Sequence, residues 1–484
     1  MITPPRRLSL DDVEPEALSS RGAGSLVGLV AANGAKFFTS WAAGRAGDKV
    51  LLGAVAVSTS SAQLLSLVGP TSIGAAASKY MALALGEGDL ATSRAVAGYL
   101  RRMALLTSLP LSAVAVVLTF FYYHRSLSEA LAVGALTLGL SGYAVARGLF
   151  FGHRHIAASA RWDILTASGA MLGTAACWLL GVHSVLIVLP LALSMLVYTW
   201  AGWPRGAGGP VSPALAKDIR HFTAFAAAGT LSSAGFVQAS QLAAEHYGGG
   251  DAGAGFYSAA FLLAAPLTIM VGAANQVLYP SMSEALGRGQ LDAFRGQLAA
   301  ATQIVSVLMT GAIGVLVVAS PLVLRLVWGP GYAPAEPLLP LLLTGVLATS
   351  VAVPGVSALT TRSAAGAGRT ALYSLIGAAA GGLVWLTCAP RFGVVAVAGG
   401  GLVAAATTAA FVLWRVSRDE QVPVMRTVLR VAVGLLLAAT LWALPRELHA
   451  PLWVSGVTAA VFFAVWVLLT RSTWLMIRSR LTAP

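Results

Sequence analysis

Residues 298–323 read LAAATQIVSVLMTGAIGVLVVASPLV, an apolar stretch without a charged side chain. A helix needs about 20 such residues to cross the hydrocarbon core of a bilayer, where unpaired backbone polar groups are not tolerated. The rest of the chain is similar: of its 484 residues, 57% are hydrophobic and only 10% are charged. A soluble domain carries about 25% charged residues to cover its water-facing surface. We therefore expect an integral membrane protein.

Thirteen further apolar runs resemble this stretch in length. Together the fourteen runs predict an all-α polytopic membrane protein with fourteen transmembrane helices. The other thirteen lie near residues 25–43, 50–78, 103–122, 130–151, 161–181, 184–203, 221–244, 253–282, 334–360, 370–389, 393–416, 428–444 and 451–470.

The distribution of basic residues predicts the orientation of these helices. Of the 31 Lys and Arg residues, 23 fall in the termini and the even-numbered connections, and 6 fall in the odd-numbered connections. The remaining two, Lys36 and Arg147, lie inside predicted helices. Because Lys and Arg collect on the cytoplasmic side of membrane proteins, both termini are predicted to be cytoplasmic and the protein to lie in the cytoplasmic membrane. The same rule explains the net charge of +13 without a nucleic-acid partner.

A short internal repeat divides the chain. The segment ALGEGDL at 84–90, followed by Arg94, matches ALGRGQL at 285–291, followed by Arg295. Gly47-Asp48 and Gly250-Asp251 match in the same way. Two six-helix units of like orientation are therefore predicted, related by a pseudo-twofold axis along the membrane normal and enclosing a central cavity. The predicted parts are a cytoplasmic N-terminal tail (1–21), an N-lobe (22–203), a cytoplasmic loop (204–220), a C-lobe (221–416), two added helices (417–470) and a cytoplasmic C-terminal tail (471–484).

Several segments, in this order, resemble one transporter group. They are YSAA at 257–260 leading to LYPS at 278–281, LRLVWGPGYAPA at 324–335, Gly368-Arg369, and FGVVAVA at 392–398. Over residues 22–416 the chain is similar to the multidrug/oligosaccharidyl-lipid/polysaccharide (MOP) exporter superfamily, in its polysaccharide branch of O-antigen flippase (Wzx-like) and MurJ-like proteins.

The resemblance implies a fold and a function. The fold would be MATE/MurJ-like, with two pseudo-symmetric six-helix lobes plus two C-terminal helices. The function would be that of a flippase, which moves a polyprenyl-pyrophosphate-linked oligosaccharide or polysaccharide precursor across the membrane by alternating access. The implied partners are the lipid-linked glycan, membrane lipids, and assembly proteins such as a polymerase and glycosyltransferases.

One polar face on an apolar helix gives the main candidate site. Lys36 lies near the middle of the first predicted helix, with Asn33 and Ser40 on the same face at i−3 and i+4. An ionisable residue inside a membrane span is costly and is by default a functional candidate. A cation there favours an anionic substrate such as a lipid pyrophosphate. The structural alternative is a lysine that bonds a backbone carbonyl and holds two helices together.

Other polar residues extend this candidate site. Lys79 and Arg147, near cytoplasmic helix ends, would complete a basic vestibule with Lys36, or else extend to the lipid headgroups. Gln238 occupies the place of Lys36 in the second unit, and Gln241 shares its face. Their amides could bind sugar hydroxyls or join helices.

Two other functions are less well supported by the sequence. A multidrug exporter of the same superfamily would require a carboxylate in its lumen, and the first six helices show no Asp or Glu at mid-depth. A polyprenyl-linked glycan polymerase or ligase would require a catalytic constellation on a large external loop, whereas the odd-numbered connections are short. We therefore expect no enzymatic activity. No metal or cofactor is expected either, since neither Cys177 nor Cys388 has a CxxC neighbour and the histidines show no metal-ligand spacing.

Overall fold

The fold comes from a computed structural model. It describes residues 7–10, 18–46, 48–206, 208–362, 364–422, 424–448, 450–471 and 473–474; for 18–26, 46, 269–281, 283, 287 and 364 it describes the backbone alone. The described residues form helices and connections, with one isolated β-bridge between Ser9 and Arg205. The expected all-α class is confirmed. Nine helical segments among these residues are long and apolar enough to cross a membrane, and the protein is a multi-pass membrane protein.

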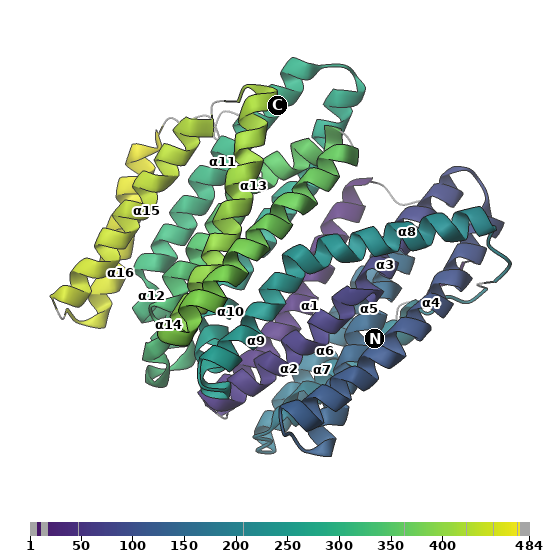
Figure 1. The fold of residues 1–484 in the computed structure, drawn as a ribbon, viewed down its shortest axis with the longest axis horizontal. Coiled ribbons are helices and arrows are strands. Elements are labelled where there is room, and N and C mark those ends of the chain that lie inside the picture. The colour runs from purple at the N-terminus through teal and green to yellow at the C-terminus, as the bar shows by residue number, and fades with distance from the viewer. Residues whose placement is uncertain are drawn as a thin grey trace. The chain divides into compact units, whose positions relative to one another are not determined.

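The chain divides into two compact units, one of residues 1–245 and 250–255 and the other of 246–249 and 256–484. The helices up to residue 247 are α1 (Leu18–Ala46), α2 (Lys49–Val68), α3 (Pro70–Gly86), α4 (Leu90–Val117), η1 (Leu118–Tyr122), α5 (Leu127–Gly152), α6 (Ile156–Leu179), η2 (Val185–Val188), α7 (Leu189–Gly202), α8 (Pro213–Thr230), η3 (Leu231–Gly235) and α9 (Phe236–Tyr247) (Figure 1). Each predicted span in this region falls on one helix or on consecutive helices.

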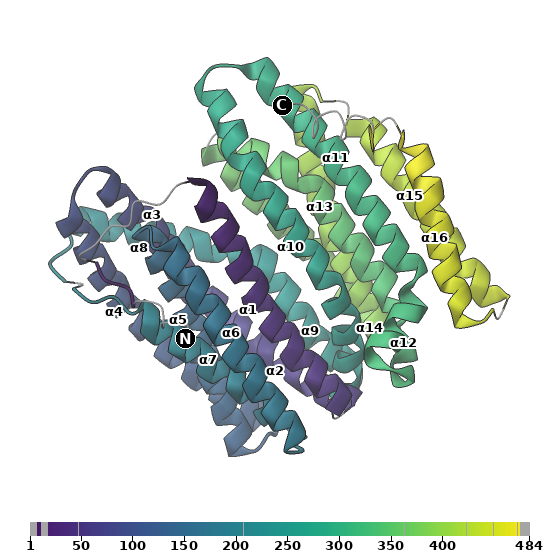
Figure 2. The same ribbon diagram turned by 180° about the vertical axis from the view of Figure 1, so that it is seen from behind.

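The remaining helices are α10 (Asp251–Gly287), α11 (Leu291–Val318), α12 (Ser320–Trp328), η4 (Pro330–Ala335), α13 (Leu338–Arg362), α14 (Ala364–Glu420), α15 (Val424–Glu447) and α16 (Leu452–Leu469). Within the second unit, α15 and α16 pack against each other and against α11 (Figure 2). Gly311 and Gly314 of α11 leave room for the rings of Trp466 and Phe462 from α16. The two helices outside the predicted repeat are thus anchored on α11.

The repeated segments adopt the same local structure. Gly88 and Gly289 both have positive φ, 77° and 71°, a conformation that glycine adopts without strain. One residue later, the amide of Asp89 donates to the carbonyl of Ala84 at 2.9 Å, and that of Gln290 donates to the carbonyl of Ala285 at 3.0 Å. The next helices, α4 and α11, then begin at positions 201 residues apart. The repeat seen in the sequence therefore specifies a repeated turn.

The boundary between the compact units differs from the predicted lobe boundary at 204–220. Helices α8 and α9 belong to the first unit, because α8 packs on α3. Phe222 of α8 meets the ring of Tyr80 edge to face, with ring centroids 5.8 Å apart. The two six-helix lobes, which place these helices in the C-lobe, stay a prediction from the repeat.

The N-terminal segment also differs from a free polar tail. Leu8 and Leu10 are buried among side chains of α3, α4, α5 and α7. Residues two apart point the same way in an extended chain, so this Leu-x-Leu pattern puts both side chains into the core. The amide of Leu8 donates to the carbonyl of Ala201 at 3.0 Å. Residues 7–10 are therefore attached to the end of α7.

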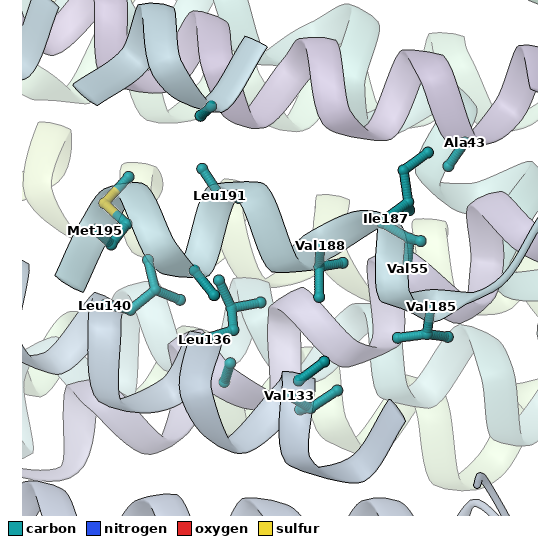
Figure 3. Close-up of a cluster of buried hydrophobic side chains, with 14 of the residues drawn as sticks. Ala43, Val55, Val133, Leu136, Leu140, Val185, Ile187, Val188, Leu191 and Met195 are labelled. Carbon is teal, nitrogen blue, oxygen red and sulfur yellow. The ribbon is translucent and has the colours of Figure 1, made fainter. Parts of the chain in front are cut away.

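A second buried cluster lies among α1, α2, α5, α6, η2 and α7, with one alanine from α4 (Figure 3). Its side chains are mostly Ala, Val and Leu, and they include Val55, Leu136, Ile187 and Met195. Gly142 of α5 leaves space for Thr199 of α7. Small residues at such positions let membrane helices approach closely, and this packing holds α5 in place for the site described next.

Candidate functional site

A buried carboxylate joins three helices of the first unit. Asp163, in the second turn of α6, has a side chain that is only 1% exposed. Its Oδ1 accepts a hydrogen bond from the hydroxyl of Tyr143 in α5 at 2.8 Å. Its Oδ2 lies 3.9 Å from Nε of Arg147, one turn further along α5. Gly28 of α1 packs so closely on this carboxylate that a Cβ there would lie 2.4 Å from Oδ2. The carboxylate is thus enclosed by α1, α5 and α6.

Two tyrosines pack beside this carboxylate. The ring of Tyr143 packs on that of Tyr198 from α7, with centroids 4.6 Å apart. The Tyr198 hydroxyl and Oγ of Ser159 in α6 lie 2.6 Å apart, within hydrogen-bond distance. Because buried polar groups require partners, this connected set fixes the rotamer of Tyr143. The hydrogen bond from Tyr143 to Asp163 is thereby pre-formed.

Lys36 adds a second cation beside Arg147. It is half-buried in α1, and its positive charge and that of Arg147 repel each other. Within the described part of the chain, no carboxylate lies within 4.0 Å of its ammonium group, and no hydrogen bond to it is present. Asp163 balances one of the two cations. The cluster of Lys36, Arg147 and Asp163, which we call the N-unit charge cluster, therefore carries one excess positive charge.

The structure places the other candidates of the first helix beside Lys36 on α1. The Nδ2 of Asn33 donates to the carbonyl of Leu29 in its own helix at 2.9 Å, which occupies one of its two N–H groups. Ser40 is buried. Among the described residues, neither Asn33 nor Ser40 forms a hydrogen bond with Arg147 or Asp163. Their role in substrate binding stays a prediction.

Lys79 has different neighbours from those expected. It is exposed on α3, and its Nζ lies 4.3 Å from the ring centroid of Phe222 and 5.0 Å from that of Tyr80. A cation over an aromatic face is stabilised by the ring quadrupole. Of the three predicted vestibule residues, Lys36 and Arg147 lie close enough for their charges to repel, while Lys79 belongs to the α3–α8 contact.

The two glutamines lie on α9. Gln238 is half-buried, while Gln241 is 2% exposed. The amide oxygen of Gln241 accepts no hydrogen bond from the described residues. An unpaired buried acceptor costs about 1–3 kcal/mol, so this amide remains available to a donor. The sequence also has two amides in α10, Asn275 and Gln276, whose side chains lie outside the described residues.

The sequence missed Asp163. It lies at the start of the predicted span 161–181, two residues after Arg161, which is counted with a cytoplasmic connection. Asp163 is therefore predicted to belong to that connection. Its burial depends on residues far away in the chain, Gly28 and Arg147. A usable signal was present, since Arg147 and Lys36 are the basic residues assigned to the interior of predicted spans rather than to the connections, and such a charge needs a partner. Asp163 is not at mid-depth in its span, but it adds a buried carboxylate near the start of α6 that the case against a multidrug exporter did not include.

The other buried acid of the described residues is also paired. Glu420, at the end of α14, forms an ion pair with Arg362 of α13 and lies 3.6 Å from Nε of Arg295 in α11. In both units, then, the buried carboxylate is compensated by arginine. Neither is left free to attract a cationic ligand without first losing an arginine.

Comparisons with known proteins relate this arrangement to a fold. The sequence matches no protein-family model and no curated protein. Solved structures do match. A MATE in complex with MaD3S is 13% identical with a TM-score of 0.60, covering 85% of this chain and 98% of its own. An inward-facing multidrug resistance MATE family transporter of the MOP superfamily is 15% identical with a TM-score of 0.57, covering 85% and 98%.

A third structure is a MOP superfamily transporter from Pyrococcus furiosus, whose description states that the reverse polarity of its binding pocket suggests a different function. It is 14% identical with a TM-score of 0.57, covering 88% of this chain and 97% of its own. The chain therefore has the fold of MATE transporters of the MOP superfamily. At sequence identities of 13–15%, the similarity shows the fold alone.

Proposed function

We propose that the protein is a membrane transporter that translocates a polyprenyl-pyrophosphate-linked saccharide across the cytoplasmic membrane by alternating access, without enzymatic activity. The observation that carries the proposal is the excess positive charge of the N-unit charge cluster, due to Lys36. Two opposite charges 4 Å apart interact by about 4 kcal/mol at an effective dielectric of 20. A pyrophosphate gains from this interaction, whereas an organic cation is repelled.

The charge balance gives the cluster its selectivity. Arg147 and Asp163 compensate each other, so the formal excess charge of the cluster comes from Lys36. A half-buried lysine for which the described residues show no partner lowers stability, and such a cost is commonly retained where function needs it. The Pyrococcus furiosus transporter, whose reverse binding-pocket polarity is described as suggesting a different function, supports the view that pocket charge and function vary together in this fold.

The second candidate is a multidrug exporter. The MATE structures and the buried carboxylate of Asp163 favour it. For Asp163 to bind an organic cation, its interaction with Arg147 would have to be released. The two functions therefore predict opposite ligand charges at the same cluster.

A thermal-shift experiment separates these candidates. We expect farnesyl pyrophosphate to raise the melting temperature of the detergent-purified protein saturably, because a ligand at 100 times its Kd stabilises the folded state by about 2.7 kcal/mol. Farnesol, which has the same tail without charge, and tetraphenylphosphonium, an organic cation, should have much smaller effects. A shift with tetraphenylphosphonium and none with farnesyl pyrophosphate would support the exporter, and no shift with any of the three would reject both candidates.

A further inference from the structure

A groove on α7 ends at an aromatic ring covered by an arginine. Leu193, Leu196, Val197 and Trp200 line an apolar groove of about 570 Å³ on the first unit. The spacing of these residues, i, i+3, i+4 and i+7, places them on one face of the helix. Three of them are substantially exposed, with Trp200 at 55%. In a membrane-spanning helix, such an apolar face is suited to contact with an acyl chain.

Arg7 closes one end of this groove. Its guanidinium carbon lies 3.7 Å from the ring centroid of Trp200, and its Nη2 donates to the Trp200 carbonyl at 2.8 Å. Leu8 and Leu10, buried in the core, hold Arg7 in this position. The cation is thus fixed at the end of the groove by the attached N-terminal segment.

A second arginine lies beside the first. The isolated bridge between Ser9 and Arg205 brings the N-terminal segment alongside the chain that leaves α7. Within the described residues, neither Arg7 nor Arg205 has a carboxylate within 4.0 Å. Burial, together with the positive charge of Arg205, lowers the pKa of Arg7. Two neighbouring cations, with no acid beside them among the described residues, form a site that is electrostatically complementary to a phosphate.

We propose that this groove binds an anionic phospholipid, with one acyl chain along Leu193, Leu196 and Val197 and the phosphate at Arg7 and Arg205. The apolar groove next to the two arginines favours a phospholipid over free phosphate, because free phosphate has no acyl chain to pack in the groove. The Arg7 N–H groups that do not bond the Trp200 carbonyl are the donors for the phosphate oxygens. The bound lipid would tie the N-terminal segment, and with it the end of α7, to the membrane surface.

The experiment measures how much phosphatidylglycerol remains on the purified full-length protein, by native mass spectrometry after exchange into micelles that contain phosphatidylglycerol and phosphatidylcholine. We expect phosphatidylglycerol to be retained preferentially. Removing each arginine by Arg7→Gln or Arg205→Gln should weaken retention about fivefold, since one basic residue at the membrane surface contributes about 1 kcal/mol. The matched control is Arg102→Gln, which removes an exposed arginine of α4 outside the groove and should leave retention unchanged.

Val197→Trp separates a lipid from free phosphate. The tryptophan fills the groove while leaving the charge unchanged, so it should reduce phosphatidylglycerol retention, and glycerol 3-phosphate should not compete for the site. Arg205 is exposed and makes no side-chain contact that the described residues show, so Arg205→Gln tests the site even where Arg7→Gln lowers stability. Wild-type retention in the double variant Arg7→Gln/Arg205→Gln, or an equal loss in Arg102→Gln, would overturn the proposal. So would retention unchanged by Val197→Trp or competition by glycerol 3-phosphate.

Discussion

Replacing Lys36 by alanine is expected to reduce transport per folded molecule by roughly tenfold or more, because an attraction of up to about 4 kcal/mol for the pyrophosphate is lost and each 1.4 kcal/mol corresponds to a factor of ten. The net loss is smaller than the full Coulomb energy, since both ions shed water when they meet. Lys36→Arg should keep part of the activity, because charge is retained while geometry and hydration change. Lys36→Glu should be least active, because it repels the anion.

Stability should move in the opposite direction. Lys36 is half-buried without a described partner and beside Arg147, so its removal relieves repulsion. We expect Lys36→Ala to keep normal membrane abundance and an equal or higher melting temperature. Lys217→Ala, which removes an exposed lysine of α8, is the matched control and should leave transport unchanged. If Lys36→Ala lowered abundance or melting temperature while transport per folded molecule stayed normal, the lysine would be structural.

Asp163→Asn is expected to have the largest effect on stability. The change leaves Arg147 and Lys36 as two neighbouring cations without compensation. Removing one member of a buried ion pair typically costs about 3–5 kcal/mol, a large fraction of the stability of a folded protein. Membrane abundance and melting temperature should both fall, while Glu87→Gln, at an exposed acid after α3, should change neither.

A second substitution tests the cause of this loss. Arg147→Met in the Asp163→Asn background removes the uncompensated cation, so we expect the double variant to regain much of the lost abundance. Such rescue is the coupling expected of residues in direct contact. An Asp163→Asn protein with normal abundance that has lost only the export of organic cations would instead assign the carboxylate to the substrate site of a multidrug exporter.

The sequence predicted the helical segments well, because each depends on a local run of apolar residues. The positions where one helix ends and the next begins were harder to predict from the sequence. The predicted span 50–78 contains two helices, α2 and α3, that meet at Gly69, where Pro70 removes a backbone donor and starts a new helix. Spans 370–389 and 393–416 were separated correctly at Gly393, whose φ of 56° interrupts α14. A break between helices was thus predicted where an apolar run ended at the turn residue, as at Gly393, and was missed where the apolar run continued through it, as at Gly69.

The candidate site could be predicted only in part. Lys36 was chosen as a candidate because a charge within an apolar helix stands out in the sequence, and its role stays a prediction. Asp163 was missed because its burial comes from contacts with Gly28 and Arg147, more than ten residues away along the chain. The attachment of Leu8 and Leu10 was missed for the same reason, since a four-residue extended segment carries no periodic signal long enough to read.

The most direct test of the central claim is a flipping assay in proteoliposomes. A fluorescent polyprenyl-pyrophosphate disaccharide is incorporated in both leaflets, and its transfer is followed by the fraction that an external quencher reaches. The wild-type protein and Lys217→Ala should move the probe at equal rates, unaffected by tetraphenylphosphonium, and Lys36→Ala should be roughly tenfold slower or worse. Equal rates for Lys36→Ala and wild type, or movement of tetraphenylphosphonium but not of the pyrophosphate lipid, would contradict the claim that Lys36 selects an anionic lipid-linked substrate.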